Sequence, residues 1–316
     1  MTSRPTSFCS FHGQSMLVNN LRIAVKSARA QGKSLGHILL AGPAGLGKTT
    51  LASSVLPAEM GVECQAINCA ALESGQDLTN VLARSQEGTI LFLDEIHMTP
   101  VSAREHLLTA MEDSAISVRV GEPPDDRVLR VELPQFTIIG ATTRPGVLDA
   151  PLRSRFQYAL TLQAYSEDEM CTILEWHAQK TSVSLDGPAA SLIARASHGV
   201  ARTGVMLLEC GIDGFWAACE EGPVVIDQAL AQSTLDRLGY CGPLSPEEHR
   251  YLMALARQTR PIGVKALSVM LDEHEQAIED IYEPWLLRQG LITRGASGRE
   301  ITEDGRSTLQ QVEGNT

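Results

Sequence analysis

The sequence has no uninterrupted run of about 18 apolar residues, so it offers no candidate for a membrane-spanning helix. The N-terminal segment also lacks the apolar core of a secretion signal, and we therefore expect a cytoplasmic protein with no membrane partner. The seven cysteines include no Cys-x-x-Cys pair. An odd number of scattered cysteines is typical of reduced thiols and argues against a disulfide framework.

Basic residues are also outnumbered by acidic ones. The chain has 26 Lys and Arg and 38 Asp and Glu, which gives a formal net charge of −12. A chain this acidic cannot collect nucleic acid through its overall field, so any DNA contact must come from a local basic surface or a partner. Aromatic residues make up only 4% of the chain, whereas hydrophobic residues make up 43%. This balance favours a globular α/β protein rich in aliphatic packing and disfavours general disorder.

Apolar segments of strand length alternate with helical patterns in the first half of the chain. Residues 15–31 carry apolar residues at helical spacing and end at a glycine, which predicts a helix. Strands are predicted at HILLA (37–41), ECQAIN (63–68), TILFLD (89–94) and FTIIGATT (136–143). Strands that alternate with helices predict an α/β fold with a parallel sheet and crossover connections.

The pattern changes at residues 115–133, where two stretches of alternating apolar and polar residues flank GEPPDD, and this predicts an inserted β-hairpin. After Phe156 the chain is predicted to be mostly helical through about Arg237. Following a joint that contains glycine and proline, the last 75 or so residues show helical patterns and then two short apolar runs around a glycine turn. Helices that end in a small hairpin predict a winged-helix domain.

Residues 42–50 read GPAGLGKTT and match the phosphate-binding motif Gly-x-x-x-x-Gly-Lys-Thr directly after a predicted strand. Glycines let the backbone wrap closely around phosphates, Lys48 supplies a compact positive charge, and the Thr49 hydroxyl is suited to bind Mg²⁺. The expected nucleotide-binding loop comprises Gly42, Pro43, Ala44, Gly45, Leu46, Gly47, Lys48, Thr49 and Thr50.

Two adjacent acids, Asp94 and Glu95, stand at the carboxyl end of the predicted strand TILFLD (89–94). Asp94 is placed to hold Mg²⁺ through water, and Glu95 to orient or polarise an attacking water. The alternative is that both acids simply end a strand in solvent. The next strand ends in Thr142 and Thr143, whose hydroxyls are candidates for detecting a γ-phosphate, although threonine is common at strand ends.

Three arginines follow the acids: Arg153 and Arg155 in APLRSRFQ, and Arg202 in HGVARTG. The planar guanidinium suits phosphate oxygens, and an arginine inserted into a neighbour's site can stabilise charge on the transferring group. Taken alone, each is as well explained as an ordinary surface arginine. Their place after the two acids favours the nucleotide site.

Taken in order, several segments resemble the RuvB family of AAA+ motors, which drive Holliday-junction branch migration. The likeness covers nearly the whole chain, from about Phe11 to about Thr302. The Walker motifs are generic, whereas the pairing of ATTR with PLRSRF and the ending IED-EP-LxxQG are characteristic of RuvB. The segments are HILLAGPAGLGKTTLA, LFLDEIH, FTIIGATTRPGVLDAPLRSRF, GVAR and IEDIYEPWLLRQGLITRGASGREIT.

The resemblance implies an AAA+ large ATPase domain over residues 1–160, a helical lid domain over residues 161–240 and a C-terminal winged-helix DNA-binding domain over residues 241–316. It also implies ATP and Mg²⁺ as cofactors. The family forms a homo-oligomeric ring, usually a hexamer, that encircles duplex or four-way-junction DNA and moves it at the expense of ATP.

The resemblance also assigns roles in the nucleotide site. Residues 42–50 become the Walker A loop, Asp94 and Glu95 become the Walker B pair, and Thr143 becomes the first sensor. Phe11 stands where the family has a tyrosine near the adenine, so its ring is expected to stack on the base.

Among the arginines, the resemblance implies that Arg155 is the finger that acts in trans, with Arg153 as the alternative. Arg202 takes the place of the second sensor in the lid. Arg294 and Arg299, in the predicted wing, are the candidates for phosphate contacts on DNA.

The hairpin at residues 115–133 resembles the element by which RuvB docks on its junction-binding partner RuvA, but its tip here is acidic, which leaves a different partner open. A second hypothesis is therefore an ATP-binding switch or adaptor that recruits a partner without moving DNA. A clamp-loader-like activity is a third, which the winged helix disfavours. We favour the motor because Lys48, Asp94, Glu95 and the candidate arginines are all present.

Overall fold

The structure is a computed structural model that describes residues 4–120, 127–218 and 222–313. The chain divides into two compact units, Met1–Tyr165 and Ser166–Thr316. The predicted boundary between lid and winged helix, at residues 240–241, lies inside the second unit and stays a prediction. Across the described ranges, no helix is long and apolar enough to cross a bilayer.

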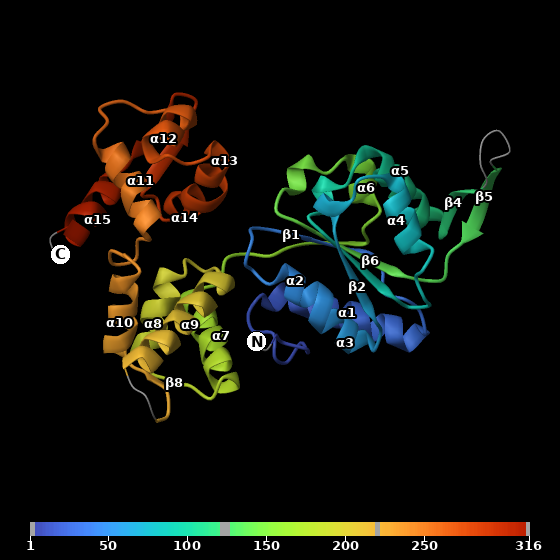
Figure 1. Cartoon of the computed structure of the whole chain (residues 1–316), viewed down its shortest axis with the longest axis horizontal. Coiled ribbons are helices and arrows are strands. Elements are labelled where there is room, and N and C mark those ends of the chain that lie inside the picture. The colour runs from blue at the N-terminus through green and yellow to red at the C-terminus, as the bar shows by residue number, and fades with distance from the viewer. Residues whose placement is uncertain (1–3, 121–126, 219–221, 314–316) are drawn as a thin grey trace. The chain divides into compact units, whose positions relative to one another are not determined.

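A five-stranded sheet forms the centre of the first unit, with the strand order β2-β3-β6-β1-β7 and parallel pairing throughout (Figure 1). The strands β1, β3 and β6 are buried along almost their whole length, as continuous apolar runs in parallel sheets usually are. All four strands predicted from the sequence are confirmed. The strands are β1 (Ile38–Ala41), β2 (Cys64–Asn68), β3 (Ile90–Asp94), β6 (Thr137–Thr142) and β7 (Tyr158–Thr161).

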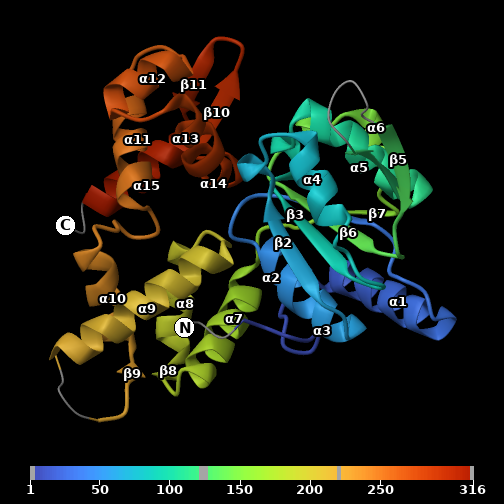
Figure 2. The ribbon, with the colours of Figure 1, turned by 45° about the vertical axis from the view of Figure 1, so that its right-hand side comes forward.

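Helices cover both faces of this sheet, as Figures 1 and 2 show. On one face lies α1 (Ser15–Gln31), which confirms the helix predicted there and buries its apolar stripe. On the other face, α4 (Gly75–Leu82) and α5 (Val101–Asp113) pack against each other and contribute to the main core. The short helix α6 (Ala150–Ser154) precedes β7.

The helix that follows the phosphate loop is interrupted. It starts as α2 (Lys48–Thr50), passes through a π-helical turn at Leu51–Val55 and continues as α3 (Leu56–Met60). Pro57 has no N–H, so the preceding turn cannot keep ordinary helical bonding, and the Leu56 N–H instead bonds to the Leu51 carbonyl. The proline therefore accounts for the interruption of the helix.

The inserted hairpin is present as β4 (Ala115–Val120) and β5 (Arg127–Glu132), which pair antiparallel from Ala115↔Glu132 to Val120↔Arg127. Its predicted tip, GEPPDD at residues 121–126, lies outside the described residues. The hairpin extends from the α4–α5 side of the sheet (Figure 1).

The expectation that the chain is mostly helical after Phe156 misses the edge strand β7, as well as the two-residue strands at Ser184–Leu185 and Val225–Ile226. β7 pairs with β1 at the edge of the sheet, from Ile38↔Tyr158 to Ala41↔Thr161. It has only four residues and is half exposed, so its apolar alternation is too short to stand out from a loop.

The second unit begins with four helices and a two-stranded parallel pair, β8 (Ser184–Leu185) with β9 (Val225–Ile226). Helix α7 carries a capping box, in which Ser166 and Glu169 satisfy each other's backbone N–H groups. The helices are α7 (Glu167–Lys180), α8 (Gly187–Ala196), α9 (Ala201–Ala218) and α10 (Gln228–Arg237).

The rest of the second unit is the predicted winged helix. Strands β10 (Ile292–Gly295) and β11 (Gly298–Ile301) form the antiparallel wing, and Ile262 bridges to Arg299 on its edge. A final helix, which was not predicted from the sequence, buries Leu309 and Val312 in this core. The helices are α11 (Pro246–Ala256), α12 (Val264–Leu271), α13 (Glu275–Ala277) with a π turn at Ile278–Tyr282, α14 (Glu283–Arg288) and α15 (Glu303–Glu313).

Candidate active site

The candidate site lies at the carboxyl edge of the central sheet. Strands β3, β6 and β1 are neighbours in the sheet and run in the same direction, so the segments that follow them meet at one edge. The Gly42 N–H donates to the Thr142 carbonyl over 3.1 Å, which joins the start of the phosphate loop to the end of β6. This edge therefore gathers the loop at residues 42–50, the pair Asp94 and Glu95, and Thr143.

The phosphate loop needs glycine at two of its turns. Gly42 has φ of +131°, and a Cβ there would lie 2.7 Å from the Leu162 carbonyl oxygen. Gly47 has φ of +100°, and a Cβ there would lie 3.1 Å from the ring of Phe11. Only glycine adopts such backbone conformations without strain. Phe11 is buried against the loop, while its stacking on adenine stays a prediction.

Lys48 is buried and its ammonium is held by the loop itself. The Nζ atom donates to the Gly42 carbonyl over 2.7 Å and to the Pro43 carbonyl over 2.8 Å. Tyr165, which no sequence motif marks, donates its O–H to the Leu46 carbonyl over 2.8 Å. The loop is thus braced from within by its own lysine and from outside by a tyrosine.

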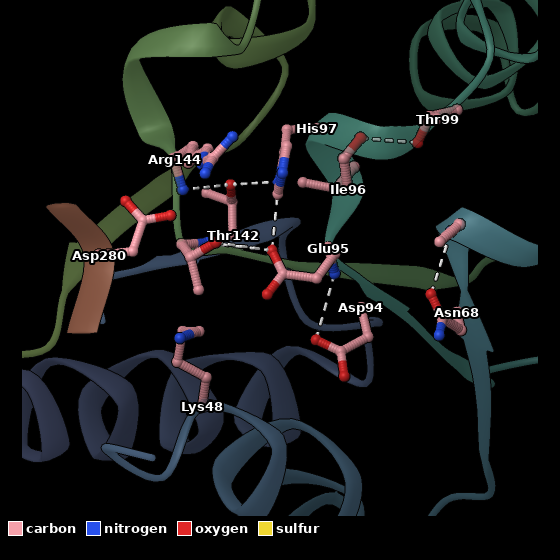
Figure 3. Close-up of polar contacts among 12 residues, drawn as sticks. Lys48, Asn68, Asp94, Glu95, Ile96, His97, Thr99, Thr142, Arg144 and Asp280 are labelled. Atoms are coloured by element: carbon pink, nitrogen blue, oxygen red, sulfur yellow. Dashed lines mark hydrogen bonds and ion pairs between the residues drawn. The ribbon is translucent and has the colours of Figure 1, made fainter. Parts of the chain in front are cut away.

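The two acids leave β3 in different directions, as Figure 3 shows. The Glu95 N–H donates to Asp94 Oδ1 over 3.1 Å. Glu95 itself has left-handed backbone angles, with φ 50° and ψ 51°, which are uncommon for a residue other than glycine. The reversal of the chain at Glu95 separates the two carboxylates.

The Glu95 carboxylate points toward the end of β6. Its Oε2 atom accepts hydrogen bonds from the Thr143 N–H over 3.2 Å and from the Thr143 hydroxyl over 3.1 Å. His97 Nδ1 lies 3.2 Å from the same oxygen and 3.0 Å from the Thr142 hydroxyl (Figure 3). Glu95, Thr143 and His97 therefore form one polar cluster at the sheet edge.

The residues present fit a nucleotide with Mg²⁺. The positive-φ glycines open the backbone for close approach of phosphate, and the N-terminus of the helix at Lys48 is favourable for anions. The half-buried Thr49 hydroxyl and Asp94 carboxylate supply the oxygen ligands that Mg²⁺ prefers in such sites. Both side chains come from the elements that meet at this edge.

The arginines near α6 lie on the first unit's surface. Arg155 NH2 forms an ion pair with Glu112 Oε2 of α5 over 2.7 Å. Arg153 is exposed. The structure contains one copy of the chain, so the choice between these two residues as a finger acting in trans stays a prediction.

Arg202 belongs to the second unit, where it is exposed in the first turn of α9. Four residues earlier, His198 connects this helical region to the winged helix. His198 Nδ1 lies 3.0 Å from Glu248 Oε1, and its ring stacks on Trp285 with a centroid separation of 3.8 Å. Arg288 adds a bond from NH2 to the His198 carbonyl over 3.2 Å.

The two wing arginines that were predicted to contact DNA differ in burial. Arg299 is buried, and its Nε donates to the fully buried Glu283 over 2.7 Å. This position does not suit a phosphate contact, so the expectation for Arg299 needs correction. Its guanidinium also pairs with Glu279, so both of its ion-pair partners lie within the domain. Arg294 is half exposed and pairs with Glu279 over 3.0 Å, so it remains the candidate.

Two family models match the chain. One, described as the Holliday junction DNA helicase RuvB P-loop domain, matches residues 3–162, and the other, described as the RuvB C-terminal winged helix domain, matches residues 242–310.

Similar full-length proteins carry the same name. The chain is 38% identical over 302 residues to the Holliday junction branch migration complex subunit RuvB of Campylobacter hominis, covering 95% of this chain and 87% of that protein. It is 39% identical over 312 residues to the protein of that name from Rubrobacter xylanophilus, covering 98% and 86%.

Solved structures agree with these matches. The Holliday junction branch migration motor RuvB of Thermotoga maritima superposes with a TM-score of 0.85 and 31% identity, covering 97% of this chain and 98% of that one. A mutant of the same protein gives a TM-score of 0.86 and 30% identity over 98% and 99%. This chain, an AAA+ ATPase with a helical lid and a winged helix, therefore belongs to the RuvB family.

Proposed function

We propose that this chain uses ATP hydrolysis to drive branch migration of Holliday junctions or related branched DNA, working in the cytoplasm as a homo-oligomeric ring, expected to be a hexamer. One observation carries the proposal: the catalytic acid candidate Glu95, the sensor candidate Thr143 and the phosphate loop with Lys48 occupy one sheet edge. The names of the relatives supply the DNA substrate, because they are described as branch migration subunits and motors.

At the site, the loop N–H groups and Lys48 bind the phosphates, and Glu95 polarises the attacking water. Thr49 and Asp94 would hold Mg²⁺, which neutralises charge on the phosphate oxygens. Thr143 hydrogen-bonds to Glu95 and can respond to the γ-phosphate, so it couples the presence of the nucleotide to the position of the acid.

The candidate arginines have separate proposed roles. Arg155, or Arg153 in its place, reaches the neighbouring subunit of the ring, where an arginine stabilises charge on the transferring phosphoryl group. Arg202 reports nucleotide to the helical region. Since His198 stacks on Trp285 and contacts Glu248, movement of that region is passed to the winged helix, where Arg294 contacts DNA phosphate.

The hairpin β4–β5 is the proposed docking element for a RuvA-like junction-binding partner. On β5, Leu129 is 50% exposed and Val131 is 38% exposed, although both are apolar. Exposed apolar side chains on a projecting hairpin are typical of a surface that a partner covers.

The test is ATP turnover and unwinding of a labelled four-way junction, measured for the chain alone and with a junction-binding partner. Glu95→Gln should lower turnover by about 10²- to 10⁴-fold, since it removes the base but keeps nucleotide binding. Glu105→Gln, which neutralises an exposed acid on α5, is the matched control and should leave turnover unchanged.

The competing function is a switch or adaptor that binds ATP without moving DNA. It would show nucleotide-dependent partner binding and no junction unwinding in any combination tested. Normal turnover by Glu95→Gln would instead reject the assignment of the catalytic acid while leaving the family unchanged.

A further inference from the structure

One carboxylate oxygen in the candidate active site is unusually well supplied with hydrogen-bond donors. Glu95 Oε2 accepts from the N–H and the hydroxyl of Thr143, and His97 Nδ1 lies 3.2 Å away (Figure 3). A carboxylate that accepts several hydrogen bonds is fixed in direction. The roles proposed above account for Thr143, but they leave His97 without one.

His97 is held in a single orientation. Its side chain is 9% exposed, and its Nδ1 lies 3.0 Å from the hydroxyl of the fully buried Thr142. The Thr142 hydroxyl oxygen in turn accepts the Arg144 N–H over 3.0 Å. The short turn that carries His97 is fixed as well, because Arg104 donates from NH2 to the His97 carbonyl over 3.3 Å.

The partners of His97 indicate which ring nitrogen carries the proton. An ionised carboxylate can only accept hydrogen bonds, whereas a hydroxyl can either donate or accept. If Nδ1 carried a lone pair, it would face Glu95 Oε2 across 3.2 Å with no hydrogen between them. The contact with Glu95 is favourable only when Nδ1 carries the proton and donates it toward Oε2.

The backbone at Glu95 shows why such support is needed. Its left-handed angles cost about 1 kcal/mol or more for a residue with a side chain. The reversal brings the side chains of Glu95 and His97 to the same side of the chain, although they are only two residues apart. The bonds that Glu95 accepts offset the cost and select this conformation.

We infer that His97 is a positioning residue for the catalytic acid, and that it acts by donating a hydrogen bond from Nδ1 to Glu95. The inference rests on the role proposed for Glu95. The Thr143 hydroxyl has a single proton and cannot donate to the γ-phosphate and to Glu95 together. His97 has no such conflict, so it keeps the carboxylate aimed while Thr143 responds to the nucleotide.

A pair of amide substitutions separates the two ring nitrogens of His97. The amide of asparagine occupies roughly the position of Nδ1, whereas the amide of glutamine reaches the position of Nε2. His97→Asn should therefore keep turnover within about threefold of wild type. His97→Gln should lower kcat by about 10- to 100-fold, the effect expected when a catalytic group is misplaced by about 1 Å.

The readouts distinguish positioning from a structural role. We expect both variants to bind a non-hydrolysable ATP analogue with a Kd within twofold of wild type and to unfold at similar temperatures. The inference is overturned if His97→Gln turns over normally, if both variants lose kcat equally, or if the loss is explained by weaker analogue binding or unfolding.

A Glu95→Gln arm keeps the two proposals apart. Normal turnover in Glu95→Gln would reject the catalytic acid, and with it the role of His97. An inactive Glu95→Gln together with a fully active His97→Gln would reject only the role of His97. Selective loss of kcat in His97→Gln, with rescue by asparagine, supports the inference.

Discussion

Replacing Arg299 with methionine tests what holds the wing to the rest of the winged helix, and Arg294→Met is its matched control. Arg299 donates from Nε to Glu283 over 2.7 Å and from NH2 to Glu279 over 2.5 Å. Its side chain is 8% exposed and that of Glu283 is 0% exposed, whereas that of Arg294 is 46% exposed. The two arginines share the same acids and differ in burial.

Methionine keeps the aliphatic volume of Arg299 but removes its charge, so the buried carboxylate of Glu283 loses a positively charged partner. Breaking a buried ion pair by removing one partner costs about 3–5 kcal/mol. Tyr251 still donates its O–H to Glu283 over 3.0 Å, because burial and the nearby Glu283 charge raise the pKa of Tyr251. We therefore expect the lower end, about 3 kcal/mol. The half-exposed Arg294 should contribute less than about 1 kcal/mol.

The assay is urea denaturation with hydrogen–deuterium exchange of peptides from the winged helix, which reports opening of that region by itself. With an m value of about 1–3 kcal/mol/M, a loss of 3 kcal/mol lowers the urea midpoint by about 1–3 M. Combining Arg299→Met with Glu283→Leu removes the buried carboxylate and should recover at least half of the loss. Equal midpoints for Arg299→Met and Arg294→Met, or no recovery in the double variant, would show that the buried ion pair does not stabilise the winged helix.

Three further predictions follow from single sites. Burial lowers the pKa of His37, so the unfolded chain binds a proton at this residue more readily and stability should fall as pH drops below about 6.5. His37→Gln should reduce that fall, measured by urea denaturation at pH 7.5 and 5.5. An equal fall in the variant and the wild type would contradict the prediction. Gly47→Ala places a left-handed Cβ against Phe11 and should weaken ATP-analogue binding about 5- to 100-fold by calorimetry; unchanged affinity would reject the constraint. Arg155→Ala should lower turnover about 10³-fold or more. Glu112→Ala, which removes only the half-exposed ion-pair partner of Arg155, should change turnover less than about fivefold. Similar losses in both variants would mean that turnover depends on the ion pair and not on an arginine finger.

The sheet was predictable because its buried strands are continuous apolar runs bounded by turn residues, as in HILLA and TILFLD. The edge strand β7 was not, since four half-exposed residues carry too little periodicity. Helix α15 was missed although Leu309 and Val312 stand one turn apart, because its first residues are acidic and polar. Thr302 accepts the Gly305 N–H over 3.0 Å at its start, so the threonine and the two acids after it form a helix-start signal that the sequence does contain.

The wing shows the limit of reading charge from sequence. Arg294 and Arg299 lie in the same hairpin, and both are arginines near glycine, so composition gives no reason to treat them differently. Burial of Arg299 depends on Glu283, which lies sixteen residues earlier in α14 and itself has no exposed surface. A charged residue is buried only when folding brings a partner of opposite charge to it, so its burial depends on the tertiary structure.

The candidate active site also contains residues that could be predicted from the sequence and one that could not. Lys48, Asp94 and Glu95 were predictable because phosphoryl transfer needs those residue types at strand ends, and the strands were readable. His97 was not predictable in this way, since residues two apart in an extended chain point to the same face of a sheet but in a helix point well apart. The left-handed backbone at Glu95 decides the matter, and no local preference of glutamate favours it. Bonds from Thr143, directly after β6, and from His97 stabilise that conformation, so the geometry of the catalytic acid depends on a neighbouring segment and not on its own motif alone.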